Sequence, residues 1–258
     1  MIELIYLLDG QSIRKMALKD EIKQENIKIK DMPLKKKAKY IWDYYKFPIL
    51  GVLVGLFLLG TFIRDYRINS RPIYLDAILI NSDLAYSPED GLKEDFIRYA
   101  SVDTDTYNLM IDSSIIIDKE NYDQMSVANA QKVLAMYTAG DMDVIIGPES
   151  IIDEYGAMGA HMDLEGIMSD ELKKDLETKG FSLYYTTEYE EDENGETTPI
   201  GTYPAGIYLE NSDYLKGLGE RGAYATLTES GQKPVFTITA TSKRSDNALQ
   251  LLKMIAGL

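Results

Sequence analysis

The sequence predicts an α/β protein in which one single-pass transmembrane helix precedes a domain with a mostly parallel sheet. Three observations support this prediction. Charge divides the 258-residue chain unequally, one stretch has no charged side chain, and strand and helix patterns alternate in the remainder. The predicted parts are a basic cytoplasmic tail over residues 1–46, a transmembrane helix over residues 47–66 and an extracytoplasmic α/β domain over residues 67–258.

Charge separates the tail from the rest of the chain. Residues 1–46 carry a formal charge of +4, residues 47–63 carry none and residues 64–258 carry −19, which together give −15. The acidic part would repel phosphate groups, and the tail contains no recognisable DNA- or RNA-binding motif, so no nucleic-acid partner is expected. The chain has no cysteine, which excludes a cysteine-linked lipoprotein anchor.

The uncharged stretch runs from Phe47 to Ile63. As a helix it would cover roughly 26 Å of a hydrocarbon core about 30 Å thick, so flanking residues must help it to span the membrane. We expect Pro48 in the first turn of this helix, where a missing N–H costs little. The lipid bilayer is therefore a predicted partner. Aromatic and cationic residues on both sides are predicted interface anchors: Trp42, Tyr44, Tyr45, Lys46, Arg64 and Tyr66.

Two alternatives stand beside a membrane span: the buried core helix of a soluble protein, and the apolar part of a cleaved signal peptide. Cleavage needs small residues after the stretch, whereas bulky residues occupy Phe62 to Tyr66. Seven lysines lie within residues 27–46 and three arginines within residues 64–83. Because the cytoplasmic flank carries the excess of cations, the N-terminus is predicted to be cytoplasmic and the C-terminal domain extracytoplasmic.

Strand and helix patterns alternate beyond a short polar linker. Apolar, β-rich runs predict strands, and Pro with acidic residues suits the positive end of a helix. The elements expected are a strand at 73–80, a helix at 88–100, a strand at 106–111, a helix at 121–137 ending at Gly140, a strand at 143–147 and a helix from Pro148. This order favours a largely parallel sheet.

The C-terminal part continues with a helix at residues 169–179 and two β-rich runs at residues 181–187 and 197–209. Asn194 and Gly195 stand between the two runs, and Asn-Gly is a strong hairpin signal. A final strand and helix complete the predicted domain.

Parts of the chain resemble the extracellular solute-binding proteins, the periplasmic-binding-protein-like family of type 2. Ala130 to Gly147 resembles a helix ending in an Ala-Gly turn before an Asp-Val strand, Ile151 to Leu164 a Tyr-bearing helix and an Asp-Leu segment, and Val235 to Ile255 the family's returning strand and helix. The resemblance implies a periplasmic-binding-protein-like α/β domain. Only about 70 residues lie between the second and third stretches, so a reduced second lobe or hairpin is expected.

The segment from Trp42 to Phe47 resembles uncharacterised single-pass proteins of Gram-positive anaerobic bacteria. No ligand-binding residue is carried over from the solute-binding family, because none of the matched positions belongs to a specific contact motif. Without an opposing full lobe, closure of two lobes around a ligand is not assumed either.

Catalytic and cofactor motifs are largely missing. His161 is the one histidine and no cysteine accompanies it, so Cys-His catalysis and Cys/His zinc sites are excluded within one chain. We expect His161 in a surface loop. Gly217 to Gly222 match Gly-x-Gly-x-x-Gly but follow a helix-like segment, which indicates a helix end and a loop rather than a dinucleotide site. No cofactor or metal is expected, and the protein is predicted not to be an enzyme.

Tyrosines gather in the predicted hairpin beside an acidic run at residues 188–196. The run lacks the spacing of a calcium-binding loop, so a solvated hairpin tip is expected. Aromatic faces can hold a ligand or a partner protein, while ordinary strand propensity explains the same residues. The candidate ligand or partner surface is Tyr184, Tyr185, Tyr189, Tyr203 and Tyr208.

These features predict a membrane-tethered, extracytoplasmic, non-catalytic binding module that captures a small-molecule ligand or contacts an envelope or transporter protein. The alternative is a structural or assembly protein of the cell envelope that acts only by docking. An envelope hydrolase with paired carboxylates such as Asp141 and Asp143 comes third. We expect Asp143 instead to open a strand and to cap local backbone groups.

Overall fold

A computed structural model describes residues 32–86, 91–121, 123–191 and 195–258. The chain forms two compact units, the first ending at Ile68 and the second running from Asn69 to Leu258. Most of the predicted cytoplasmic tail, the start of the helix predicted at 88–100 and the Asn194 position of the hairpin turn lie outside the described residues.

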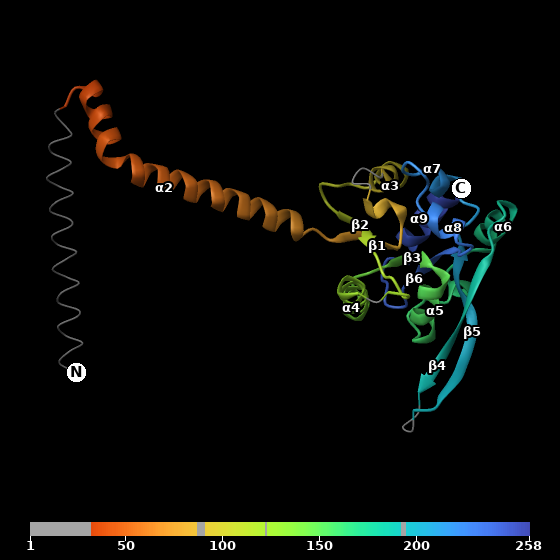
Figure 1. Ribbon diagram of the computed structural model, residues 1–258. Coiled ribbons are helices and arrows are strands. Elements are labelled where there is room, and N and C mark those ends of the chain that lie inside the picture. Colours follow the sequence, from red (N-terminus) through yellow and green to blue (C-terminus); the bar gives the residue numbers. More distant parts are fainter. Residues whose placement is uncertain (1–31, 87–90, 122, 192–194) are drawn as a thin grey trace. The chain divides into compact units, whose positions relative to one another are not determined.

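The described part of the first unit is a single helix, α2, Leu34–Asn69. An 18-residue window of α2 has a mean hydropathy of 2.1 and none of its residues is buried, so α2 is long and apolar enough to cross a membrane. The expectation for Pro48 was wrong: it lies inside α2, because the helix already begins at Leu34. An internal proline removes a hydrogen bond and clashes with the preceding turn, and α2 bends along its length (Figure 1).

The second unit is built on one six-stranded sheet with the strand order β2-β1-β3-β6-β5-β4 (Figure 1). The strands are β1 Ile73–Ile80, β2 Asn108–Ile115, β3 Val144–Pro148, β4 Leu183–Glu191, β5 Thr197–Tyr208 and β6 Pro234–Ile238. The structure confirms the α/β class, with helices following β1, β2 and β3 as the alternating patterns predicted.

The sheet is mixed, not mostly parallel as predicted. β1 pairs in parallel with β2 and β3, whereas β3 with β6, β6 with β5 and β5 with β4 are antiparallel. The reason lies in the connections. Helical crossovers join the first three strands, while a hairpin joins β4 to β5 and therefore fixes an antiparallel pair.

Helix ends follow the capping residues. Asp123 accepts a hydrogen bond from the Ser126 N–H at the start of α4, and Gly140 ends that helix with a φ of 70°. Ser169 caps α6 in the same way, through the Leu172 N–H. The helices of the second unit are α3 Leu92–Ala100, α4 Gln124–Ala139, α5 Glu149–Ala157, α6 Asp170–Thr178, α7 Asp213–Gly217, α8 Ala225–Glu229 and α9 Ser245–Ala256, with short 3₁₀ turns η1 Asp83–Tyr86 and η2 Leu164–Gly166.

Two apolar clusters cover the two faces of the sheet. Alternation along β1 sends Leu75 and Leu79 into the cluster that α3, α6, α7, α8 and α9 cover, and Ile78 and Ile80 into the cluster that α4 and α5 cover. The segment between Leu164 and Val235 contributes two strands, β4 and β5, to this same sheet, and it also contains α6, α7 and α8. The described residues of that segment thus extend one domain with a hairpin instead of forming a second lobe.

The β4–β5 hairpin projects from the sheet. β5 pairs with β6 only through Gly206, Ile207 and Tyr208, whereas it pairs with β4 along its whole length. Residues 185–191 and 197–204 therefore form a two-stranded ribbon beyond the edge of β6 (Figure 1). We call this segment the β4–β5 ribbon.

Candidate functional site

A cleft of about 520 Å³ lies where β1, β2 and β3 end. Asn81 follows β1, Ile116 follows β2 and Pro148 ends β3, and all three line the cleft. We call it the carboxyl-end cleft. Its walls come from the loops after these strands, from the start of α5 and from α8: Asn81, Ser82, Asp83, Ile116, Ile117, Asp118, Lys119, Glu120, Pro148, Ser150, Ile151, Thr226, Leu227, Ser230 and Gln232.

Asn81 fixes the loop that forms one wall of the cleft. Its side-chain amide donates to the Ile117 carbonyl at 2.9 Å, and its side-chain oxygen accepts from the Ile117 N–H at 2.7 Å. The backbone of Asn81 is left-handed, with a φ of 53°. Such a conformation costs energy in a residue with a side chain, and asparagine tolerates it better than most.

Ser82 and Asp83 tie the end of β1 to the segment around α8. The buried Ser82 hydroxyl donates to the Ala223 carbonyl at 2.9 Å. The two carboxylate oxygens of Asp83 accept from the N–H and the hydroxyl of Thr226, at 2.9 and 2.5 Å. These bonds hold α8 against the carboxyl end of β1 and so shape the cleft.

Carboxylates outnumber cations in the cleft wall. Lys119 lines the cleft together with Asp83, Asp118 and Glu120. Its ammonium already binds Glu154 at 2.5 Å and the Ser150 carbonyl at 3.1 Å. Backbone N–H groups of Asn121 and Glu120 donate to the Asp118 carboxylate and lower its pKa. Asp118 therefore stays ionised at neutral pH, and the cleft favours cations or neutral polar groups over anions.

The remaining polar side chains of the cleft can both donate and accept hydrogen bonds. Ser150 and Ser230 bring hydroxyl groups, and Gln232 brings an amide. Across the parts of the chain that the structure describes, no group of three or more His, Cys, Asp and Glu residues could hold a metal ion. The cleft is therefore suited to a polar organic ligand that several hydrogen bonds orient.

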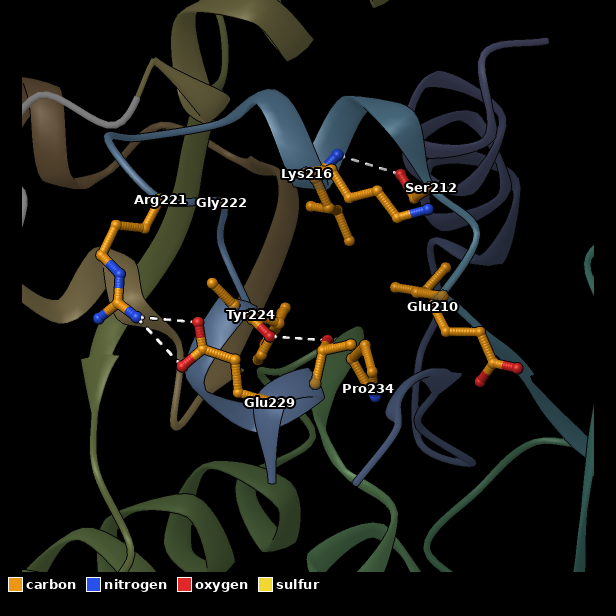
Figure 2. Close-up of a pocket in the computed structure, with 12 residues that line it drawn as sticks. Glu210, Ser212, Lys216, Arg221, Gly222, Tyr224, Glu229 and Pro234 are labelled. Carbon is orange, nitrogen blue, oxygen red and sulfur yellow. Dashed lines mark hydrogen bonds and ion pairs between the residues drawn. The ribbon is translucent and has the colours of Figure 1, made fainter. Parts of the chain in front are cut away.

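A second, smaller cavity of about 310 Å³ borders α8 through Ala225, Thr228 and Glu229, whereas the cleft borders it through Thr226 and Leu227. Figure 2 shows the residues that line this second cavity. Arg221 and Glu229 border it and bind each other, with 3.0 and 3.2 Å between one guanidinium nitrogen and the two carboxylate oxygens. We call this cavity the α7–α8 pocket. It is lined by Leu209, Glu210, Ser212, Leu215, Lys216, Arg221, Gly222, Tyr224, Ala225, Thr228, Glu229 and Pro234.

The structure divides the five tyrosines of the predicted hairpin surface. Tyr184 is buried and meets the Tyr208 ring edge to face, with 5.7 Å between ring centroids. Their hydroxyls donate to Asp153 and Glu149 on α5, each at 2.5 Å, and burial with these carboxylates raises both pKa values. The Tyr203 hydroxyl donates to a backbone carbonyl, that of His161. These three tyrosines attach the hairpin to the domain.

Tyr185 and Tyr189 remain on the surface of the β4–β5 ribbon. Their exposed fractions are 56% and 45%. Ile200, on the neighbouring strand, is also exposed. The ribbon thus presents two of the five predicted tyrosines to solvent, together with an aliphatic side chain that the sequence did not single out.

The predicted interface anchors all lie on α2. Trp42, Tyr44 and Tyr66 are exposed, and the Lys46 ammonium lies 5.3 Å from the centroid of the Phe47 ring. Tyr45 and Arg64 belong to the same helix. All six predicted anchors therefore lie on the helix that contains the uncharged stretch, on either side of it.

The expected place of His161 was wrong. The side chain is only 2% exposed, and its Nε2 lies 2.9 Å from the Ile152 carbonyl oxygen. The residue pairs in an isolated β-bridge with Thr239, directly after β6, and so lies beside the sheet instead of in a surface loop. Burial lowers the His161 pKa to about 4. His161 is therefore a neutral core residue near neutral pH.

Asp143 lies immediately before β3 and is fully buried. Its carboxylate accepts from the Asp76 N–H, the Ser242 hydroxyl and Arg244. Burial and the neighbouring Asp143 charge raise the pKa of Asp76 to about 7. Sequence reasoning missed Asp76, although one carboxyl within an otherwise apolar strand was a visible signal.

Gly217, Gly219 and Gly222 belong to a helix end and loop, as the Gly-x-Gly-x-x-Gly interpretation expected. Gly217 is the last residue of α7, and Gly219 and Gly222 have φ values of 73° and 101°.

No protein-family model matches the chain, and comparisons with curated proteins and with solved structures gave no match either.

Proposed function

We propose that this protein is a membrane-tethered, non-catalytic binding module that holds a small polar ligand in the carboxyl-end cleft. The observation that carries the proposal is the position of the cleft, at the carboxyl ends of three adjacent parallel strands. Ligands of open α/β sheets bind at this edge, because the loops after the strands converge there.

The cleft wall indicates the class of ligand. Three carboxylates and one cation line it, and the cation Lys119 is already paired with Glu154. A phosphate or carboxylate ligand would meet repulsion there, whereas an amine or a polyhydroxylated molecule would find acceptors and hydroxyl groups. We therefore favour a sugar-like or amine-bearing ligand.

The likeness to extracellular solute-binding proteins supports the same function. The helix and strand from Ala130 to Gly147 correspond to α4 and β3, and the Asp163–Leu164 segment forms the start of η2. β3 delivers Pro148 to the cleft. Of the segments that carry the resemblance, the one ending in β3 thus leads directly to the proposed binding site.

Exposed apolar side chains on α2 support the membrane tether. They occupy most positions from 47 to 63 and so point to every side of the helix: Phe47, Ile49, Leu50, Val52, Leu53, Val54, Leu56, Phe57, Leu58, Leu59, Phe62 and Ile63. Water would penalise this surface, whereas lipid would accept it. The excess of lysines before the span supports the proposed orientation, with the N-terminus in the cytoplasm and the α/β domain outside.

The topology is tested by thiol labelling, since the chain has no native cysteine. Ser70→Cys, just beyond the span, should react with a membrane-impermeant maleimide on intact cells. Ser12→Cys, in the tail, should react only after the cells are opened. Labelling of Ser12→Cys alone on intact cells would overturn the proposed orientation.

Ligand binding is tested by calorimetry on the full-length protein in detergent, with sugars and small amines as probes. Ser150→Trp should fill the carboxyl-end cleft and abolish any binding found there. The matched control is Thr178→Trp on α6, where the side chain is exposed and is not among the residues that line the cleft. Failure of every probe to bind, or equal binding by both variants, would reject the cleft as the site.

A second function, docking onto an envelope or membrane protein, is favoured by the β4–β5 ribbon. Tyr185, Tyr189 and Ile200 are exposed on it, and its acidic residues include Glu188 and Glu190. If docking is the function, crosslinking in membranes yields a stoichiometric partner that Tyr185→Ser with Tyr189→Ser loses and Tyr99→Ser, on α3, retains. Absence of a stoichiometric partner counts against it.

A further inference from the structure

We propose that the α7–α8 pocket is a second binding site and takes a short aliphatic carboxylic acid in its ionised form. Apolar side chains contribute much of the lining, among them Leu209, Leu215 and Tyr224. Charged side chains stand around the border, as Figure 2 shows. The contacts that these polar and charged groups already make within the domain decide which ligand the pocket favours.

The hydroxyl groups of the lining are already used as donors. The Ser212 hydroxyl donates to the Ile255 carbonyl at 2.6 Å. Thr228 donates to the Tyr224 carbonyl at 2.9 Å, and the Tyr224 hydroxyl donates to the Ile146 carbonyl at 3.0 Å. None of these three protons is available to a ligand. A polyhydroxylated molecule would therefore lose hydration without regaining its hydrogen bonds, whereas an apolar chain has none to lose.

Both carboxylates of the lining already bind a cation. Arg221 lies 3.0 and 3.2 Å from the two carboxylate oxygens of Glu229. The Oε1 of Glu210 accepts from the Lys233 ammonium at 2.9 Å, and its Oε2 is buried and so out of reach of a ligand. An amine would have to compete with an existing cation at either carboxylate. The pocket therefore does not favour a cationic ligand.

Lys216 is the cation of the lining that has donors to spare. Within the described residues, its ion pair joins it to Asp213 at 3.9 Å, on the same helix and at a fully exposed carboxylate outside the lining. Such a pair contributes little. More than half of the Lys216 side chain is exposed, and Figure 2 shows it extending along the border of the pocket. The carboxylate of a ligand would pair with this ammonium.

The size of the pocket limits the ligand to a short chain. A volume of about 310 Å³ is near the lower end of ligand pockets. Each methylene group that the pocket buries should strengthen binding by up to about fourfold. The ion pair with the half-exposed Lys216 should add about two- to fivefold. Affinity should therefore depend steeply on chain length and more weakly on the charge of the head group.

This site is separate from the carboxyl-end cleft. α8 borders both cavities through different residues, since Thr226 and Leu227 line the cleft while Ala225 and Thr228 line the pocket. The acidic cleft wall disfavours a carboxylate, which is the group that Lys216 would bind in the pocket. Blocking the cleft with Ser150→Trp should therefore leave binding of an aliphatic acid unchanged.

The test is calorimetry on the full-length protein in detergent at millimolar ligand, with the heat of titration into detergent alone subtracted. Hexanoate should bind about tenfold more tightly than butanoate, and about two- to fivefold more tightly than hexan-1-ol or hexylamine. Thr228→Trp should fill the pocket and abolish binding. The matched control is Thr178→Trp, because each of these threonine hydroxyls donates to the carbonyl four residues before it.

Reversal of one charge tests the role of Lys216. Lys216→Glu should make hexylamine bind more tightly than hexanoate, whereas Lys174→Glu, at an exposed position on α6, should keep the wild-type preference. Thermal unfolding shows which variants fold, and if Thr228→Trp does not, the charge reversal alone decides.

Four results would overturn the proposal. They are no binding of hexanoate, binding that a folded Thr228→Trp leaves unchanged, binding that Ser150→Trp abolishes, and a preference for hexanoate that Lys216→Glu does not alter.

Discussion

Arg244 and Asp143 form an ion pair in which the carboxylate is fully buried, with 2.7 Å between Arg244 Nε and Asp143 Oδ2. The same carboxylate accepts from the Asp76 N–H at 2.9 Å and from the Ser242 hydroxyl at 2.7 Å. Arg244 also donates to the Asp141 carbonyl at 2.9 Å. The pair therefore joins β1, the start of β3 and the segment that leads into α9, which is a structural role.

Arg244→Ala should destabilise the domain strongly. Removing the cation leaves the Asp143 charge buried without its counterion, which typically costs about 3–5 kcal/mol. Urea unfolding of the full-length protein, followed by circular dichroism, measures this loss. Lys243→Ala, at the exposed neighbouring position, should change stability by less than about 0.5 kcal/mol. A loss below about 1 kcal/mol in Arg244→Ala would show that the pair is dispensable.

Asp76→Asn should stabilise the protein increasingly as pH rises. Burial and the nearby Asp143 raise the Asp76 pKa from 3.8 to about 7, so between these values the folded state binds more protons than the unfolded state. The contribution of this carboxyl is full below pH 3.8 and is lost as pH rises through 7. Asparagine does not titrate. Relative to the wild type, the free energy of unfolding of the variant should therefore rise by up to about 1.4 kcal/mol per pH unit between these pKa values. Urea midpoints across this range measure it, with the exposed Asp105→Asn as the control.

His161→Gln should reveal the opposite slope. Burial lowers the His161 pKa from 6.5 to about 4, so between these values the unfolded state binds more protons. The histidine's contribution is full above pH 6.5 and is lost as pH falls through 4. Glutamine has no titrating group and keeps an N–H donor for the Ile152 carbonyl. On acid unfolding, this variant should therefore lose less stability than the wild type as the pH falls from 6.5 to 4.

The two titrations overlap and oppose each other in the wild type. From about pH 4 to 6.5, Asp76 lowers stability with rising pH while His161 raises it, each by up to about 1.4 kcal/mol per unit. Their contributions nearly cancel, so the wild-type pH dependence should be flatter than that of either variant. Slopes of the same sign in Asp76→Asn and His161→Gln would contradict this account.

Local signals in the sequence predicted most elements but not the strand directions. β1 begins and ends at the predicted residues because its apolar run is bounded by polar ones, and Gly140 ends α4 because the cap needs a positive φ. β6 pairs antiparallel to β3 through contacts distant in the sequence. Such pairing depends on tertiary packing, which a pattern of alternating strands and helices does not contain.

The sites were less predictable than the fold. The cleft could be anticipated at the ends of the first and third strands, because loops after parallel strands meet there. His161 was misplaced because its burial depends on a bridge to Thr239, far away in the chain. Glu210 and Lys216 carry no motif, and only the folded domain brings the loop after β5 and α7 to the lining of one pocket.

Gly156→Ala should destabilise the junction between α5 and β4. A Cβ at this buried position would overlap the Thr186 hydroxyl and lie 3.2 Å from a ring carbon of His161. Alanine would ordinarily strengthen a helix by about 1 kcal/mol, but crowding in a packed core costs about 1–3 kcal/mol. Because the Thr186 and His161 side chains that it would meet are both buried, we expect a net loss on urea unfolding. Gly166→Ala, where a Cβ meets nothing within 4 Å, is the control, and Thr186→Ala should restore part of the stability. Gly156→Ala more stable than the wild type would show that α5 can move away from β4.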